Sequence, residues 1–402
     1  MFKIFSSGLL IYLFPILAIL GAPAVNILIV LLCFFYLNKI NKISLDYNKI
    51  NIYLLLLFAF WLYIFFISFF SKYYKVALYS SFSYIRFLIF TLAISWIVTN
   101  KINYQKLINY FLIAILFVDF DIIFQYFTGY DIFGYPSSTN RHGGPFGNEL
   151  VAGAFLSKIS LPVLSLSFYK IKTGSLKEKL FNLFLIILTT VSILLSGDRL
   201  PSFHIILFLI LASLIFLNFR NFLMVLLVLF LLLLILINSS SLVKNRFNDT
   251  KIIFNNFSNS SYYHLYENSV NVWKQNKLFG VGIKNYNLIC DEITKDYKKK
   301  EHDYCSSHPH NIFLELIVST GIIGAIIFYS AFILIFKEFL KLKKNKSDKR
   351  FMYLFFGSCF TILFYINPIS TTGSIFTSWN ASFLWFHLGL SIGLYNRMMK
   401  NK

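Results

Sequence analysis

The sequence predicts an all-α polytopic membrane protein with about twelve transmembrane helices and one long polar loop. Hydrophobic residues make up 57% of the chain, and charged residues only 13%. Apolar runs of about twenty residues, long enough to cross a hydrocarbon core of about 30 Å, recur along its whole length. Polar residues gather instead in residues 239–310, which are rich in Asn, Ser, Lys and Tyr. We therefore expect residues 1–402 to form a single membrane domain into which this loop is inserted.

The apolar runs define the expected spans in chain order. Two of them are short for a bilayer core, so an early pair is also compatible with a re-entrant hairpin. The loop at 239–310 falls between the ninth and the tenth span. The expected spans cover residues 4–20, 24–37, 52–70, 82–99, 107–127, 149–169, 181–196, 202–217, 222–238, 311–336, 351–367 and 379–396.

Lysines in the short loops indicate how the spans are oriented. They gather in residues 38–51, 170–180 and 337–350, which fall on one side if every span crosses the membrane. The positive-inside rule assigns this side to the cytoplasm, and both termini with it. We therefore expect the long loop, residues 239–310, to face the external compartment.

Composition and residue spacing argue against nucleic-acid, metal and cofactor partners. The net charge of +20 is compatible with nucleic-acid binding, but most of the cations lie in loops beside anionic lipid. They have no accompanying aromatic-plus-basic motif, so we predict no nucleic-acid partner. The external acids and histidines do not have the spacing of metal ligands, and the Gly280-Val281-Gly282 segment lacks a βαβ context. We therefore predict no metal and no cofactor.

Charged residues inside the expected spans are costly and are candidates for function. They are Arg86, Asp119, Asp121 and Lys158. The two aspartates lie two residues apart and thus on different helix faces, so we do not expect a close carboxylate pair. Either aspartate forms an ion pair with Lys158 or Arg86 in the bundle, or the group forms a proton relay. The sequence does not choose between them.

The long loop has two further features. Apolar and aromatic residues recur at helical spacing over 262–276, which predicts an amphipathic helix on the membrane surface or over an external cavity. Cys290 and Cys305 also lie in this loop. In an oxidising compartment they can close a loop of about fifteen residues, worth up to about 3 kcal/mol. The sequence leaves their pairing open, and we expect Cys33 and Cys359 to be core residues.

Histidines stand where the long loop meets the next span. His308 and His310 end the loop, and His264 and His302 lie earlier in it. Imidazole is easily tuned to exchange protons near neutral pH, so His310 is the first candidate for a general base. The alternative is an interfacial histidine pair that anchors a helix end.

Arginines on the external side are candidates for binding phosphate. Arg199 lies in a tight turn between two spans, Arg246 just beyond the ninth span, and Arg141 in an earlier outer loop. A guanidinium holds a diphosphate through paired hydrogen bonds and stabilises it as a leaving group. We expect Asp198 to orient the Arg199 guanidinium. The alternative for each arginine is an anchor for lipid headgroups.

Three segments resemble the O-antigen ligase and O-antigen polymerase superfamily. The main one is His310-Asn311 followed at family spacing by Gly321 and Gly324. The others are residues 195–199, similar to the family's turn between two spans, and residues 144–148, similar to its Gly-x-Phe-Gly-Asn loop. The resemblance covers the chain from about residue 140 onward.

The resemblance implies a metal-independent glycosyltransferase of the bacterial inner membrane, with a helical fold related to the GT-C class. Such a ligase moves a glycan from undecaprenyl pyrophosphate to a hydroxyl of lipid A–core on the periplasmic face. A polymerase that joins lipid-linked repeat units is the alternative. A protein O-oligosaccharyltransferase and a non-enzymatic lipid-glycan transporter are less favoured, because internal repeats are absent and the polar residues gather on one face.

The same resemblance assigns roles to residues of this chain. His310 matches the catalytic histidine, and Arg199 and Arg246 match arginines that bind substrate. Arg141, His308 and His264 are further candidates for substrate binding, and Asn311, Gly321 and Gly324 belong to the motif. Where the family often has another arginine, this chain has residues 262–264, so that contact is either lost or taken over by His264 or Lys274.

Overall fold

The computed structural model describes residues 7–39, 49–138, 141–294, 305–342, 348–371 and 373–400. Regular structure in these ranges is helical, and β pairing is limited to isolated bridges such as Asn311 with Thr371. The predicted all-α class is therefore confirmed. Among the described residues, eight helices are long and apolar enough to cross a membrane, and three further apolar helices are shorter.

A helix is present at each of the twelve apolar runs that the sequence singles out. The last of these helices, α15, continues to Lys400, and the tenth, α13, contains a break described below. The bounds are α1 (Ser7–Ile19), α2 (Ala22–Leu37), α3 (Lys49–Ser68), α4 (Tyr74–Asn100), α5 (Tyr104–Thr128), α6 (Ala152–Thr173), α7 (Leu176–Leu195), α8 (Arg199–Phe216), α9 (Phe219–Ser239), α13 (Ile312–Phe339), α14 (Lys349–Ile366) and α15 (Ser378–Lys400).

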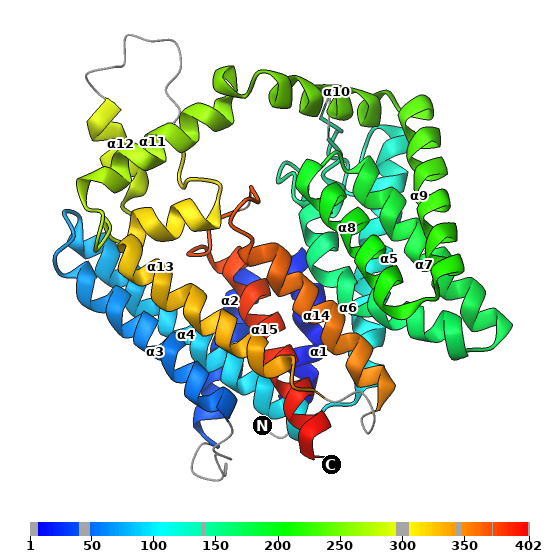
Figure 1. Ribbon diagram of the computed structural model, residues 1–402, viewed down its shortest axis with the longest axis horizontal. Helices are drawn as coiled ribbons and strands as arrows, with labels where there is room; N and C mark the ends of the chain where they lie inside the picture. Colours follow the sequence, from blue (N-terminus) through cyan, green and yellow to red (C-terminus); the bar gives the residue numbers. More distant parts are fainter. Residues whose placement is uncertain are drawn as a thin grey trace.

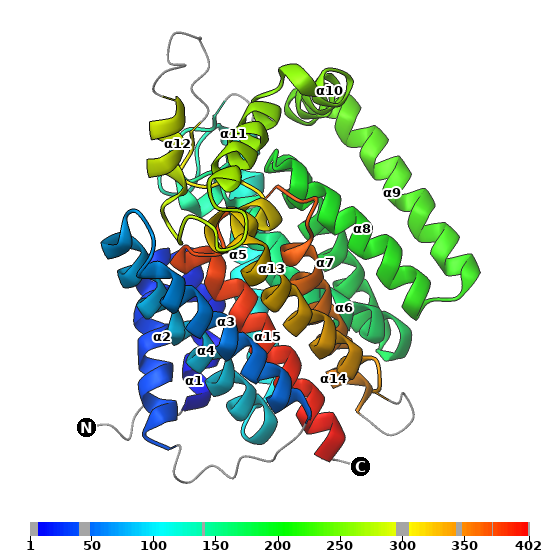
Figure 2. The same cartoon turned by 60° about the vertical axis from the view of Figure 1, so that its left-hand side comes forward.

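The long polar loop is itself largely helical. It contains α10 (Ser241–Asn255), α11 (Ser261–Gln275) and α12 (Tyr286–Thr294), together with the short turn η3 (Phe257–Asn259). Helix α11 occupies the amphipathic segment of the sequence, and Ser260 caps it by accepting a hydrogen bond from the Tyr263 amide. These helices lie at the end of the bundle opposite both chain termini (Figures 1 and 2).

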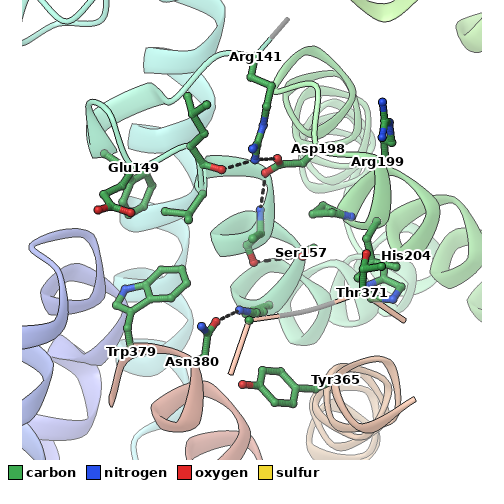
Figure 3. A pocket seen from close by; sticks show the side chains of 18 of the residues that line it. Arg141, Glu149, Ser157, Asp198, Arg199, His204, Tyr365, Thr371, Trp379 and Asn380 are labelled. Carbon is green, nitrogen blue, oxygen red and sulfur yellow. Dashed lines mark hydrogen bonds and ion pairs between the residues drawn. The ribbon is translucent and has the colours of Figure 1, made fainter. Parts of the chain in front are cut away.

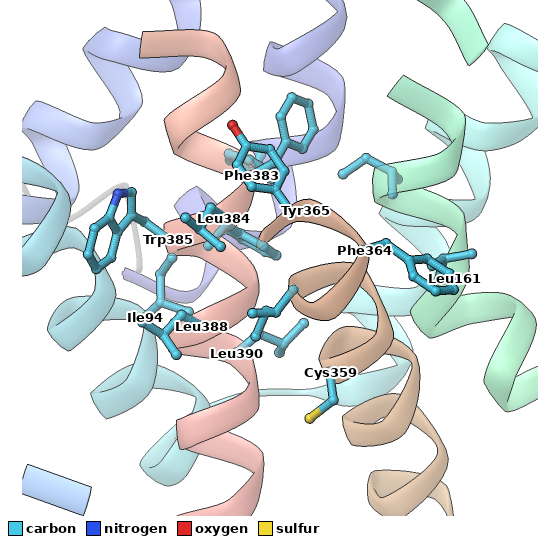
Figure 4. Packing of buried hydrophobic residues seen from close by; sticks show 14 of the residues in the cluster. Ile94, Leu161, Cys359, Phe364, Tyr365, Phe383, Leu384, Trp385, Leu388 and Leu390 are labelled. Atoms are coloured by element: carbon cyan, nitrogen blue, oxygen red, sulfur yellow. The ribbon is translucent and has the colours of Figure 1, made fainter. Parts of the chain in front are cut away.

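Helix α15 lies near the centre of the bundle and packs against α4 and α14, and α6 packs against α14, α7 and α8. The contacts are mostly aromatic and aliphatic. Trp385 is fully buried beside Tyr84, and the rings of Phe14 and Phe386 stack with centroids 4.0 Å apart. Figure 4 shows this packing between α14 and α15. Tight packing at the centre holds the helix ends that surround the candidate site.

Helix α9 differs from the other spans because it stands at the side of the bundle (Figure 2). Leu229 is its one buried residue, and it packs against α8 and α10. Its remaining apolar side chains suit contact with lipid, as expected for a peripheral span.

A break in α13 joins the long loop to the membrane helices. Gly321 has a φ of 67°, and backbone from the loop fills the gap in the helical hydrogen bonding. The amides of Val281 and Gly282 donate to the carbonyls of Val318 and Ser319 at 2.8 and 3.0 Å. The Ile322 amide donates to the Lys277 carbonyl at 3.0 Å. Irregular backbone within a span is tolerated where other protein groups satisfy it, as they do here.

A disulfide joins Cys290 to Cys305, which answers the question that the sequence leaves open. Cys290 lies in α12 and packs with Val272, Val281 and Val318. The bond thus ties the segment before the histidines to the same cluster that covers the break in α13.

Candidate functional site

A cavity of about 790 Å³ opens beneath the long loop. Its walls come from elements spread over the whole chain: the α1–α2 turn, the segment before α6, the α7–α8 turn, and the facing parts of α14 and α15. Arg246 of α10, Tyr262 of α11 and His310 also line it. The structure therefore brings Arg141, Arg199, Arg246 and His310 together in one cavity, although they are up to 169 residues apart by number (310 minus 141).

The three arginines form one wall of the cavity. Arg141 forms an ion pair with Asp198 and donates to the Leu150 carbonyl. Arg199 lies 3.3 Å from the Asp249 carboxylate. Arg246 donates from Nε to the Gly197 carbonyl at 2.8 Å and lies 3.8 Å from Asp249. Figure 3 shows Arg141 and Asp198 in contact, with Arg199 beside them.

The predicted partner of Arg199 is wrong. Asp198 was expected to orient the Arg199 guanidinium, but it pairs with Arg141. Asp198 also accepts a hydrogen bond from the Ala154 amide at 3.2 Å, so its carboxylate faces α6. Arg199 is the first residue of α8 and points toward α10 instead, where Asp249 lies. Asp198 is the N-cap and Arg199 the first residue of α8, so their side chains project in different directions. The distant residue that each one meets depends on how the helices pack, which the sequence does not reveal.

The arrangement of charges suits an anionic ligand. The three guanidiniums share two carboxylates, those of Asp198 and Asp249, so the wall keeps an excess of positive charge. Burial lowers the pKa of Arg246, and so do the nearby guanidiniums of Arg199 and Arg141. Burial raises the pKa of Asp198, and the adjacent Arg141 opposes this. An anion bound at this wall would relieve the repulsion among the arginines.

His310 lies at the edge of the cavity next to the start of α13. Its φ is 53°, and its ring lies 4.0 Å from that of His308, centroid to centroid. Burial lowers its pKa, which favours the neutral imidazole. The next residue, Asn311, caps α13 by accepting from the Leu314 amide at 2.9 Å. Its amide group donates to the Pro368 carbonyl at 2.7 Å, which fixes His310 between α13 and the segment before α15.

Other predicted site residues lie elsewhere. His308 contacts His310 but is not part of the cavity wall. His264 lies in α11, 3.8 Å from Glu267, and Lys274 contacts Asn271, both away from the cavity. Tyr262 occupies the wall in their place. His302 lies outside the described residues.

Gly321 and Gly324 of the motif lie where a side chain would not fit. Gly321 forms the break in α13, and a Cβ there would overlap the backbone of Leu278. At Gly324 a Cβ would press on Thr320 and on the Tyr63 ring, 2.8 Å away. They hold the loop and the α3–α13 contact in place.

Of the two alternatives for the charges within the spans, the ion pairs are not found among the described residues. The Asp119 carboxylate accepts from the Thr189 hydroxyl at 2.7 Å, and Asp121 from the Ile132 amide at 2.8 Å. Arg86 donates to the Ser378 hydroxyl at 3.0 Å. Each of these groups thus contacts a neutral partner, and the ion-pair alternative is not supported. Asp119 Oδ1, Asp121 Oδ2 and Arg86 Nε are buried and have no hydrogen-bond partner among the described residues.

The structure adds residues that sequence reasoning did not place in the site. Lys158 of α6 donates to the Asn380 side chain at 2.8 Å, and Trp379, Tyr365 and Glu149 also line the cavity. Lys158 was recognisable as a charge within a span. No sequence signal indicated its partner, 222 residues later. Among the described residues, no group of three or more His, Cys, Asp or Glu side chains is placed to hold a metal ion.

The fold and the cavity together define a multi-pass helical membrane protein with a cationic site beneath its polar loop. A family model described as O-antigen ligase matches residues 184–329. This part of the chain carries the domain of the O-antigen ligase and polymerase superfamily, so the family predicted from the His310 motif is confirmed. No curated protein matches the chain.

Proposed function

We propose that the protein is an O-antigen ligase that transfers a glycan from undecaprenyl pyrophosphate to a hydroxyl of lipid A–core. The reaction takes place on the periplasmic face of the inner membrane, and both termini are cytoplasmic. One observation carries the proposal: three arginines and His310 line a single cavity beneath the polar loop. The family match at residues 184–329 supports the same reaction class.

Arg199, Arg246 and Arg141 bind the diphosphate of the donor in this proposal. Their guanidiniums neutralise the charge that grows on the diphosphate as the glycosidic bond to it breaks. Because guanidiniums stay charged at all physiological pH values, this role does not require a metal ion.

His310 activates the acceptor. Its neutral imidazole takes the proton from the acceptor hydroxyl while that oxygen attacks the anomeric carbon. The bond between the anomeric carbon and the diphosphate oxygen breaks, and the electron pair leaves with undecaprenyl pyrophosphate. Attack on the face opposite the leaving group inverts the anomeric configuration.

The first experiment is a transfer assay with the purified protein and a lipid-pyrophosphate glycan. It offers two acceptors, lipid A–core and a second lipid-linked repeat unit. We expect the glycan on lipid A–core. A ladder of longer lipid-linked glycans would instead identify a polymerase. Transfer to neither acceptor would contradict both assignments and leave a protein acceptor or a transporter.

The rate of transfer is expected to stay high at mildly acidic pH. Burial places the pKa of His310 below its usual value of 6.5, so the imidazole remains neutral until the pH falls through that lower value. The acid limb of the kcat/KM profile for the acceptor is therefore expected below pH 6.5.

Donor binding measured over the same pH range is the control, because it separates titration of His310 from titration of the diphosphate. An acid limb above the usual histidine value, with donor binding unchanged, would contradict this assignment.

A further inference from the structure

Lys158 differs from the other cations of the cavity in having no carboxylate in direct contact among the described residues. Arg141 pairs with Asp198, and Arg199 and Arg246 share Asp249. Among the described residues, no carboxylate lies within ion-pair distance of Lys158. Its amine donates to the neutral Asn380 side chain at 2.8 Å. A charge within a membrane span normally requires a counter-ion or a functional ligand.

The surroundings of Lys158 hold its amine in one place. The ammonium lies 4.9 Å from the centre of the Trp379 ring, 5.2 Å from Phe383 and 5.3 Å from Tyr365. Aromatic faces stabilise a cation but do not neutralise its charge. Trp379 is itself fixed, because its indole donates to the Ala18 carbonyl at 2.9 Å. The amine is therefore held in one place without an ion pair to a carboxylate.

Lys158 also lies deeper than the arginine wall. It is four residues beyond Ala154, whose amide contacts the Asp198 carboxylate that pairs with Arg141, and four residues correspond to about 6 Å along the helix axis. Figure 3 shows Asn380, its partner, across the cavity from Arg141 and Arg199. An extended ligand can therefore contact the arginines with one part and Lys158 with another.

We propose that Lys158, oriented by Asn380, binds an anionic oxygen of the donor at the floor of the cavity. This inference rests on the proposed function for the identity of the ligand. The oxygen belongs either to the diphosphate or to a carboxylate of an acidic sugar next to it. Both accept a hydrogen bond from an ammonium group, and both supply the missing counter-ion.

Binding to the full-length protein, measured without any acceptor, tests this proposal. The first probe is undecaprenyl pyrophosphate without a glycan. The second is a pair of lipid-linked sugars that differ only in carrying glucuronate or glucose. Lys158→Met keeps the length of the side chain and removes its charge. Lys170→Met is the matched control, because Lys170 lies in the same helix but pairs with Glu178 outside the cavity.

We expect Lys158→Met to weaken binding roughly 10- to 100-fold, the range for losing a hydrogen bond to a charged group. Weaker binding of undecaprenyl pyrophosphate identifies the diphosphate as the ligand. Loss of the preference for glucuronate over glucose, with undecaprenyl pyrophosphate binding unchanged, identifies a carboxylate. If Lys158→Met and Lys170→Met bind every probe as the wild type does, the proposal is overturned.

A second variant keeps the test decisive if Lys158→Met does not fold. Asn380→Asp is nearly isosteric and supplies Lys158 with an internal carboxylate. We expect this variant to fold. We expect it to bind undecaprenyl pyrophosphate or the glucuronate-carrying lipid more weakly, because the new carboxylate competes with the anionic oxygen of the ligand for Lys158. Unchanged affinity of this variant would overturn the proposal.

The outcome is separable from that of the proposed function. A wild-type protein that binds undecaprenyl pyrophosphate through Lys158 but transfers no glycan would refute the ligase assignment alone. A protein that transfers glycan with no contribution from Lys158 to binding would refute the anion site alone.

Discussion

Replacing His310 by Asn is expected to lower the rate of glycan transfer by about 10²- to 10⁴-fold, the range for losing a general base. Asparagine suits this position because it tolerates the left-handed backbone conformation that His310 adopts, with a φ of 53°. The variant thus retains the backbone and a hydrogen-bonding side chain but loses the ability to accept the proton. The measurement is the transfer rate at saturating donor and acceptor.

Donor binding is the control for this variant. We expect His310→Asn to bind undecaprenyl pyrophosphate as the wild type does, since the arginines hold the diphosphate in our proposal. Arg199→Gln, in contrast, should weaken donor binding. Transfer by His310→Asn at the wild-type rate would remove His310 from the mechanism.

Replacing Gly321 by Ala is expected to destabilise the protein by roughly 3 kcal/mol or more. Two effects combine at this position. A φ of 67° with a ψ of −177° is a conformation that essentially only glycine adopts and costs other residues roughly 1–3 kcal/mol, and the added Cβ would overlap the backbone of Leu278. The loop at residues 277–282 would then lose its hydrogen bonds to α13. The midpoint of thermal unfolding in detergent measures the effect.

Gly129→Ala is the matched control for this prediction. Gly129 ends α5 with a φ of 81°, and an added Cβ there meets no atom within 4 Å. Its substitution therefore measures the cost of a side chain at a positive φ without a steric contact, about 1–2 kcal/mol. If both variants unfold at the same temperature, the contact between the loop and α13 contributes nothing to stability.

The helical architecture was predictable because its cause is local. A span requires about twenty apolar residues in sequence, so each run indicates its own helix. The same holds for α11, whose apolar face is visible at helical spacing in the sequence. The break at Gly321 is partly visible, because glycine is the residue that adopts a positive φ without strain. The loop backbone at residues 277–282, which fills this break, is not visible in the sequence.

The residues of the candidate site could be selected from the sequence, but their pairings could not. Arg199, Arg246, Arg141 and His310 were selected as candidates from their places in external turns and loops and from the family resemblance, and they line one cavity. Pairings depend on how distant helices pack. The sequence therefore suggested Asp198 for Arg199, whereas the structure gives Asp198 to Arg141. For the same reason, the contact of Lys158 with Asn380 had no counterpart in any local pattern.

The spread of the cavity walls along the chain determines what a truncated protein can do. A fragment limited to residues 184–329 would contain Arg199, Arg246 and His310, but neither Arg141 nor Lys158 nor Asn380. It would also lack α14 and α15, which provide the opposite side of the cavity and the core that holds it. Fragment expression and domain grafting are thus poor routes to an active enzyme. Variants of this site belong in the whole polypeptide.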